Sequence, residues 1–235
     1  MFKNSSENRV PVRKDKFHTI AEVRDYDQAA PRNTLLYPMQ RLKELIKPYM
    51  KEGKTIVNLG CETGILVLMS SGENGVHITG FDEEPLLIKG AEENLRLAKL
   101  CSYPGDATFT YAELTNLPLA SHTVDVVFAD NFLYKTEKIA EVLKECRRIV
   151  KDTGVIIMNQ LIRDADKEKI QFLRQYLKND VFGGEEEFIE TLNSCYSYVE
   201  YVKVLQENKE LGYEIRKEQM SVIISYNAEK INDWI

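Results

Sequence analysis

Short apolar runs alternate along the chain with longer segments in which apolar residues recur every three or four positions. The short runs are typical of buried strands, and the longer segments of helices that bury one face. Strands that alternate with helices pair in parallel through right-handed crossovers. The predicted strands cover residues 55–59, 76–81, 107–112, 124–129 and 155–159.

The helices around these strands have recognisable ends. Gly53 follows the first helix, and Pro85 suits a first helical position because its missing N–H would have no partner there. Thr136 and Asp164 are the expected caps of two later helices, and residues 151–154 are the expected turn before the fifth strand. The predicted helices cover residues 33–50, 65–71, 85–100, 136–150 and 164–177.

The last quarter of the chain breaks this alternation. Ser197 and Glu200 form a capping-box pattern, which predicts a helix that ends at Gly212. Two further apolar runs, residues 213–217 and 220–226, follow with no room for a crossover helix between them. They are therefore expected to pair as an antiparallel hairpin. The whole pattern predicts an α/β fold with a mostly parallel sheet.

Composition narrows the class of protein. Apolar residues make up 43% of the chain and charged residues 29%, which is ordinary for a globular protein with a buried core. The formal net charge of −6 argues mildly against a nucleic-acid partner, because binding to phosphates draws on clustered Lys and Arg. A local basic patch on an acidic protein remains the alternative.

Neither a membrane span nor a cysteine framework is expected. No apolar run reaches the roughly 18 residues that a membrane-spanning helix needs, and the first residues lack the apolar core of a signal peptide. The cysteines lack the C-x-x-C spacing of metal or disulfide sites, so a reduced, cytoplasmic setting is the simplest expectation. They are Cys61, Cys101, Cys146 and Cys195.

A glycine-rich turn, Gly60 to Gly64, follows the first strand and opens the next helix. Such a turn lets the backbone approach a ligand closely, with free N–H groups nearby. Asp82 ends the next strand roughly 20 residues further on, where a carboxylate can accept hydrogen bonds from ribose hydroxyls. Together they predict a cofactor that contains a nucleoside. A tight turn with a capping acid is the alternative.

The segment Asn58–Gly64 resembles the first motif of class I S-adenosylmethionine-dependent methyltransferases, whose usual form is Asp-Leu-Gly-Cys-Gly-Thr-Gly. Asp82 matches the ribose-binding acid of that family, and residues 112–119 resemble its adenine-binding motif. Asp130-Asn131-Phe132 resembles the fourth motif, which borders the methyl donor, and residues 145–154 resemble a structural Arg-x-Leu-Lys-Pro-Gly-Gly stretch. The resemblance covers roughly residues 55–160.

This resemblance implies a three-layer Rossmann-like fold with a mostly parallel seven-stranded sheet that ends in an antiparallel hairpin. It implies S-adenosylmethionine as the cofactor, and no metal. Residues 1–50 would form an N-terminal arm with lid helices, and residues 51–235 the methyltransferase domain, with a substrate-cap insertion at about 178–212. The implied cofactor-binding residues are Asn58, Gly60, Cys61, Glu62, Gly64, Asp82, Glu83, Ala112, Glu113, Leu114, Asp130, Asn131 and Phe132.

Two positions depart from the family pattern. Asn58 stands where the family usually has an acid, and Glu62 stands where it usually has the middle glycine. One interpretation is an exchange of roles, in which Glu62 holds the ammonium group of the cofactor and Asn58 positions water or backbone. The other interpretation is sequence drift in a weak or inactive binder.

The sequence does not fix a catalytic group. Methyl transfer is an in-line displacement in which positioning and the exclusion of water can suffice, so a base is needed only where the acceptor must lose a proton. The candidates are His18, in the region expected to cover the site, and Asn131 and Tyr134, which follow the fourth strand. A solvated terminus and a pocket wall are the structural alternatives for His18 and Tyr134.

A small-molecule acceptor is the leading hypothesis, favoured by the acidic net charge and by an aromatic-rich region with Tyr196, Tyr198 and Tyr201. Methylation of a protein or RNA and a non-catalytic binding module are the alternatives. An NAD-dependent dehydrogenase would need a third glycine at the helix start, where Leu66 and Val67 stand instead.

Overall fold

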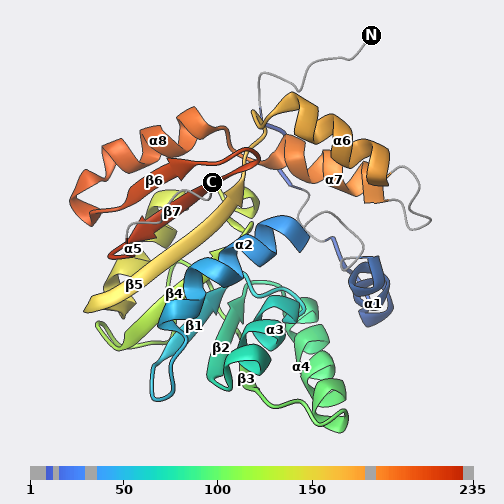
Figure 1. Cartoon of the computed structure of the whole chain (residues 1–235), viewed down its shortest axis with the longest axis vertical. Coiled ribbons are helices and arrows are strands. Elements are labelled where there is room, and N and C mark those ends of the chain that lie inside the picture. Colours follow the sequence, from blue (N-terminus) through green and yellow to red (C-terminus); the bar gives the residue numbers. More distant parts are fainter. Residues whose placement is uncertain (1–8, 13–15, 30–35, 178–183, 230–235) are drawn as a thin grey trace.

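The computed structural model describes residues 9–12, 16–29, 36–177 and 184–229. A seven-stranded sheet forms its middle layer, with helices on both faces (Figure 1). The strands are β1 (Ile56–Leu59), β2 (His77–Asp82), β3 (Asp106–Tyr111), β4 (Val124–Asp130), β5 (Val150–Leu161), β6 (Glu214–Lys217) and β7 (Ser221–Tyr226).

The helices divide into those that cover the sheet and those that lie near the carboxyl ends of its strands. The α-helices are α1 (Ile20–Ala29), α2 (Leu36–Ile46), α3 (Ile65–Asn74), α4 (Pro85–Leu100), α5 (Ile139–Ile149), α6 (Lys167–Leu177), α7 (Gly184–Ser194) and α8 (Tyr198–Glu207). The described residues also form the short 3-10 helices η2 (Lys47–Tyr49), η3 (Leu133–Lys135) and η4 (Lys209–Leu211).

The strand order is β3-β2-β1-β4-β5-β7-β6. The first five strands in chain order pair in parallel, whereas β7 runs antiparallel to both β5 and β6. This confirms the predicted mostly parallel sheet with a C-terminal hairpin. The order reverses between β1 and β4, and the carboxyl ends of strands at such a reversal are where open α/β sheets bind ligands.

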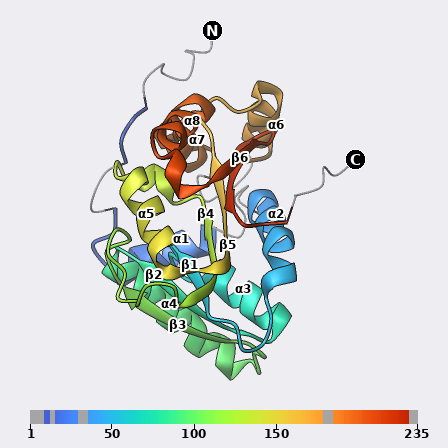
Figure 2. The same cartoon turned by 90° about the vertical axis from the view of Figure 1, so that its left-hand side faces the viewer.

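The burial pattern of each strand follows its place in the sheet. All four residues of β1 are buried, as expected for a central parallel strand covered on both faces, whereas β3 lies at the edge and alternates between buried and exposed residues. Buried side chains of α2, α3 and α4 pack on one face, and those of α5 and α8 pack on the other. Figure 2 shows the sheet between α5 and α2.

The expected turn at residues 151–154 is wrong, because these residues belong to a continuous β5. The pairing with β4 shifts register there: Val124 pairs with Val150, but Val126 pairs with Val155. The additional residues therefore bulge within the strand. The Lys151 ammonium pairs with the Asp125 carboxylate at 2.7 Å and fixes the bulge to β4.

Two expected caps are also wrong. The chain forms η3 after β4, so α5 begins only at Ile139, and the Thr136 hydroxyl accepts a hydrogen bond from the Lys138 N–H at 3.0 Å ahead of it. The α6 helix begins at Lys167, and its first turn is capped by Asp166. The Asp164 carboxylate instead accepts from the Tyr198 N–H at 2.9 Å.

Other helix ends match the sequence more closely. The Ser197–Glu200 capping box is confirmed, and η4 follows α8 before the chain turns at Gly212. The α3 helix continues past Gly72 and ends at Gly75. Residues 1–8, 33–35 and 178–183, which belong to the expected arm, first helix and insertion, lie outside the described residues. None of the helices that the structure describes is long and apolar enough to cross a membrane.

Candidate functional site

The glycine turn lies at the carboxyl end of β1. Gly60 has φ +64° and Gly64 has φ +78°, which is the left-handed region that glycine adopts without strain. A Cβ on Gly60 would lie 2.4 Å from Cβ of Phe132, and one on Gly64 would lie 2.5 Å from Cζ of Phe109. The turn therefore requires glycine both for its backbone conformation and for its packing.

Asp82 lies beside this turn at the end of β2 and is 6% exposed. Its carboxylate accepts hydrogen bonds from the Glu62 N–H at 2.9 Å and the Glu84 N–H at 3.0 Å. Burial raises the pKa of Asp82, against the lowering effect of the nearby Lys135 charge. The carboxylate thus joins the glycine turn to the start of α4, next to the place expected for a ribose.

The loop after β3 completes this side of the site. The Ala112 N–H donates to the Asp82 carbonyl at 3.0 Å, and the Leu114 N–H donates to the Glu83 carboxylate at 2.8 Å. Glu83 therefore holds the loop in place. Ala112 and Leu114 are buried, whereas Glu113 is exposed. Glu83 therefore has a partner within the protein, whereas Glu113 is exposed just after β3.

Glu62 is the unusual member of the turn, with φ +48°. Its carboxylate forms an ion pair with the Lys135 ammonium and accepts a hydrogen bond from the Tyr26 hydroxyl at 2.9 Å. Burial raises the pKa of Glu62, but the Lys135 charge and the hydrogen bonds lower it by more. The net shift of the Glu62 pKa is therefore downward. Lys135 was not predicted, since it lies 73 residues away in the sequence.

Three polar side chains gather at the carboxyl ends of β1, β4 and β5. The Asn159 amide donates to the Asp130 carboxylate at 2.7 Å, and the Asn58 amide donates to the Phe128 carbonyl at 3.1 Å. Burial raises the pKa of Asp130 to about 7. The amide oxygens of Asn58 and Asn159 are buried and have no hydrogen-bond partner in the described part of the chain. These acceptors suit a ligand that carries hydrogen-bond donors.

Asn131 and Phe132 lie directly after β4. Asn131 has φ +42°, and its side-chain oxygen accepts from the Leu161 N–H at 3.2 Å, so it joins β4 to β5. The N–H groups of Phe132 and Leu133 donate to the buried side-chain oxygen of Gln160, at 3.1 Å and 2.9 Å. Gln160 was not predicted, because a lone glutamine in an apolar strand carries no recognisable motif.

The remaining catalytic candidates lie on two different segments. His18 is exposed just before α1, and its backbone N–H donates to the Glu22 carboxylate at 2.6 Å. Tyr134 belongs to η3, beside Lys135, and burial raises the pKa of its hydroxyl. Tyr134 and Asn131 therefore share the segment after β4, whereas His18 lies in the N-terminal segment just before α1.

The N-terminal segment contacts the glycine turn. The Asp27 carboxylate accepts hydrogen bonds from the Thr63 hydroxyl and from the Asn94 amide, the latter at 2.6 Å. Lys16 pairs with Glu187 of α7 at 2.5 Å. Together with the bond from Tyr26 to Glu62, these contacts extend residues 16–29 from the cofactor side to α7. The segment therefore contacts both the glycine turn and α7.

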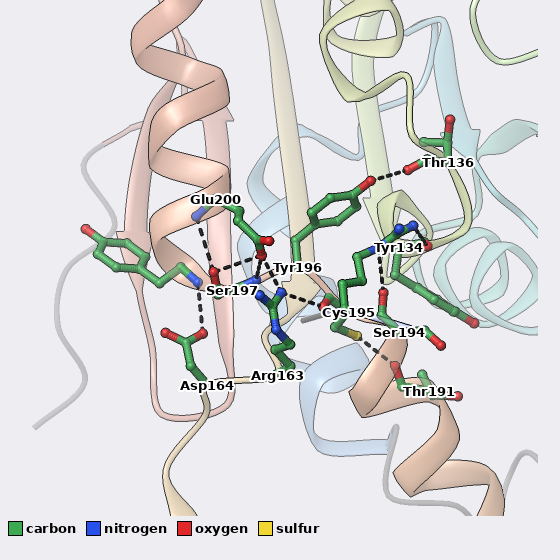
Figure 3. Close-up of polar contacts among 12 residues, drawn as sticks. Tyr134, Thr136, Arg163, Asp164, Thr191, Ser194, Cys195, Tyr196, Ser197 and Glu200 are labelled. Carbon is green, nitrogen blue, oxygen red and sulfur yellow. Dashed lines mark hydrogen bonds and ion pairs between the residues drawn. The ribbon is translucent and has the colours of Figure 1, made fainter. Parts of the chain in front are cut away.

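The junction between α7 and α8 lies against the segment that follows β4 (Figure 3). The Tyr196 hydroxyl donates to the Thr136 carbonyl at 2.8 Å. Arg163 donates to the Cys195 carbonyl at 3.2 Å and pairs with Glu200. Tyr201 is only 1% exposed. Of the tyrosines expected to favour a substrate, Tyr201 thus belongs to the core and Tyr196 fixes the junction.

Comparison with known proteins agrees with this geometry. Residues 57–158 match a family model described as a methyltransferase domain. The structure of a protein from Methanococcus maripaludis assigned to the S-adenosyl-L-methionine-dependent methyltransferases superposes with a TM-score of 0.69 at 16% identity, over 95% of this chain and 99% of that one. A SAM-dependent methyltransferase from Aquifex aeolicus gives 0.58 at 16% identity, over 89% and 98%.

The curated relatives are longer proteins. A tRNA U34 carboxymethyltransferase of Nautilia profundicola is 26% identical over 162 residues, 68% of this chain and 50% of that protein. A ribosomal protein L11 methyltransferase of Thermotoga petrophila is 26% identical over 130 residues, 55% of this chain and 46% of that protein. The chain thus spans about half the length of these relatives. Together, the match over residues 57–158, the sheet order and the glycine turn show that the chain contains a class I S-adenosylmethionine-dependent methyltransferase domain.

Proposed function

We propose that the protein transfers the methyl group of S-adenosylmethionine to a small-molecule acceptor. The observation that carries this proposal is the position of the Gly60–Gly64 turn beside Asp82, at the point where the strand order reverses. A ligand with a ribose and an extended amino-acid chain fits a backbone turn next to a buried carboxylate.

Different residues would bind different parts of the cofactor. Asp82 would hold the ribose hydroxyls, and Glu113 would hold the adenine amino group. The turn that begins at Gly60 would bind the amino-acid chain of the cofactor. The cofactor supplies a methyl group that is already activated by its positive sulfur. The chain therefore needs mainly to orient the acceptor and exclude water. Where the acceptor must lose a proton, Asp130 suits the task, because burial raises its pKa to about 7.

The covering segments support a small acceptor. Residues 16–29 bond to the glycine turn on one side, through Tyr26 and Asp27, and Lys16 bonds to α7 on the other. A site covered in this way is suited to a compact molecule more than to a polymer. The net charge of −6 also disfavours binding to a phosphate backbone. In this proposal residues 9–12 and 16–29 act as the lid, and the described part of 178–212 acts as the cap over the acceptor.

A macromolecular acceptor is the second candidate function, favoured by the names of the curated relatives, which modify a tRNA and a ribosomal protein. Those proteins are about twice as long as the matched region, so the parts of them that select the acceptor need not be present in this chain.

The first test is calorimetry with S-adenosylhomocysteine, in which we expect binding at micromolar concentration, about −8 kcal/mol. The second is incubation of the protein with cell extract and cofactor carrying a labelled methyl group, followed by separation into small molecules, RNA and protein. Label among the small molecules supports the proposal. Label in RNA or protein supports the second candidate. Absence of calorimetric heat at millimolar ligand contradicts both.

A further inference from the structure

The ion pair between Glu62 and Lys135 is a feature of this chain that the family pattern does not contain. We propose that these two residues recognise the amino-acid end of the cofactor as a complementary pair, with Glu62 binding its ammonium group and Lys135 its carboxylate. The inference rests on the proposed function and assigns a new binding residue, Lys135, to the site.

The Glu62–Lys135 ion pair lies between the proposed ribose acid and the end of β4. The Glu62 N–H bonds to Asp82, the proposed ribose acid, while the Glu62 carboxylate reaches Lys135 in η3, beyond the end of β4. The pair therefore spans the carboxyl ends of β2, β1 and β4. A nucleoside held at Asp82 would extend its amino-acid chain in this direction, because β1 and β4 bound the reversal in strand order.

Both side chains of the ion pair are partly exposed to solvent. The side chain of Lys135 is 34% exposed and that of Glu62 is 29% exposed, so both remain within reach of a ligand from solvent. Tyr26 donates to the second carboxylate oxygen of Glu62 and orients it. A carboxylate with one oxygen held by a hydroxyl and the other on a partly exposed ammonium can exchange that ammonium for another.

The neighbouring cations are engaged elsewhere. Arg9 donates to the carbonyls of Ser194 and Tyr134, both at 3.0 Å. Lys16 pairs with Glu187. Lys135 thus differs from Arg9 and Lys16, because its partner, Glu62, belongs to the glycine turn. Among the described residues, Lys135 is the cation whose salt-bridge partner lies in the glycine turn, which places it to meet an anionic group there.

Charge balance explains why a pair suits this task. The amino-acid end of the cofactor carries one positive and one negative charge, so each member of the protein pair would exchange one partner of opposite sign for another. Neither charge is left unpaired in a half-buried site, which would be costly. The same balance accounts for Asn58, because the charge that the family usually places at that position is supplied by Glu62.

The test compares three probes that share the adenosine and its sulfur and differ in the chain attached to that sulfur. S-adenosylhomocysteine carries both groups, its decarboxylated analogue carries only the ammonium, and 5′-methylthioadenosine carries neither. Dissociation constants are measured by calorimetry for the full-length protein and for Lys135→Met and Glu62→Gln, with circular dichroism as the check of folding. Lys138→Met is the matched control, because Lys138 lies three residues away, is 64% exposed and pairs only weakly, at 4.0 Å, with Glu141.

We expect Lys135→Met to weaken S-adenosylhomocysteine binding about 10-fold, which corresponds to about 1.4 kcal/mol. It should leave both other probes within about 2-fold. Glu62→Gln should weaken the two probes that carry the ammonium and spare 5′-methylthioadenosine, and Lys138→Met should change none of them.

Three results overturn the inference. Equal or tighter S-adenosylhomocysteine binding by Lys135→Met would show that Lys135 merely competes for Glu62. Equal weakening of all three probes by Lys135→Met would show a structural role. If the unaltered protein binds none of the three probes, the proposed function itself is wrong. Binding of 5′-methylthioadenosine as tightly as S-adenosylhomocysteine would keep the nucleoside site and reject the pair.

Discussion

The two sides of the site are built in different ways. On the side of β1, β2 and β3, short loops are held by hydrogen bonds from their backbone N–H groups to nearby side chains. The bond from the Glu62 N–H to Asp82 is an example. On the side of α7 and α8, the contacts join segments far apart in the chain: Arg9 and Ser194 are separated by 185 residues, and Lys16 and Glu187 by 171. The first side is a fixed frame, and the second is a cover assembled by tertiary contacts.

This difference predicts how the two sides respond to change. A substitution in the frame should alter folding and cofactor affinity together, because the same atoms form the turn and the site. A substitution in the cover should alter local opening and leave cofactor affinity nearly unchanged. The predictions below test this division, beginning with the frame.

The largest effect is expected from Gly60→Ala. The new Cβ would meet Phe132 at 2.4 Å and would stand on a backbone with φ +64°. We expect a loss of about 2–4 kcal/mol in the free energy of unfolding, together with the loss of cofactor binding. Urea denaturation and calorimetry measure the two effects.

Gly75→Ala is the control for that substitution. Gly75 has the same φ of +64°, but nothing lies within 4 Å of its added Cβ. It therefore carries the backbone strain alone, and should cost about 1 kcal/mol without changing cofactor affinity. If the two variants are equally stable, packing against Phe132 does not define the turn.

Asp82→Asn should have the next largest effect. The carboxylate accepts two backbone N–H bonds and is the proposed ribose acid. Loss of a charged acceptor should weaken S-adenosylhomocysteine binding by about 1.5–3 kcal/mol, measured by calorimetry. Glu83→Gln serves as the control, because its side chain holds the Leu114 N–H and should change affinity less. A larger effect of Glu83→Gln would indicate that Glu83, and not Asp82, binds the ribose.

Asp130→Asn should change how stability depends on pH. Burial raises the pKa of Asp130 from an ordinary value of 3.8 to about 7, so the folded protein binds more protons than the unfolded chain between those two values. The contribution of Asp130 to stability therefore falls as pH rises through this window. The amide variant should be about 1–3 kcal/mol more stable than the original at pH 8 and equally stable at pH 4.

Thermal unfolding at the two pH values measures this difference. Asp125→Asn gives the opposite control, because the ammonium groups of Lys151 and Lys54 and a backbone hydrogen bond outweigh desolvation and lower the pKa of Asp125 to about 2. That variant should be less stable than the original at pH 8 and should approach it at low pH. A gain for Asp130→Asn of the same size at both pH values would contradict the raised pKa.

The frame was predictable from the sequence because its information is local. The alternation of strands and helices, the glycines at positions 60 and 64 and the acid at the end of β2 all lie within short stretches. Their geometry follows from backbone conformation and strand register. Where local patterns were ambiguous, the interpretation was wrong: residues 151–154 read as a turn, yet pairing with β4 keeps them within β5.

Contacts between distant segments were not predictable, in the cover or at its border with the frame, because their information is not local. Nothing near Glu62 in the sequence indicates Lys135, and nothing near Cys195 indicates Arg163, because each contact forms only when the sheet brings distant segments together. Gln160 in β5 illustrates the same point within a strand. It reads as one polar residue in an apolar run, but it holds two N–H groups of the segment after β4.

The smallest effect is expected in the cover, from Arg9→Met. The guanidinium donates to the Ser194 and Tyr134 carbonyls and lies 4.3 Å from the ring centroid of Tyr196, so it joins the N-terminal segment to α7 and to η3. Its loss should increase the rate of amide hydrogen exchange at residues 9–12 and 191–196 several-fold, while the dissociation constant for S-adenosylhomocysteine stays within about 2-fold.

Arg24→Met is the comparison for this variant, because Arg24 pairs with Glu93 on the outside of the same N-terminal segment and is 57% exposed. An exposed pair of this kind contributes little, so exchange should not change there. The pair of variants separates the cover from the frame. Faster exchange without loss of affinity places Arg9 in the cover alone. A parallel loss of cofactor affinity would mean that the contact of Arg9 with the Tyr134 carbonyl positions η3 and its Lys135, and the division between the two sides of the site would then fail at that contact.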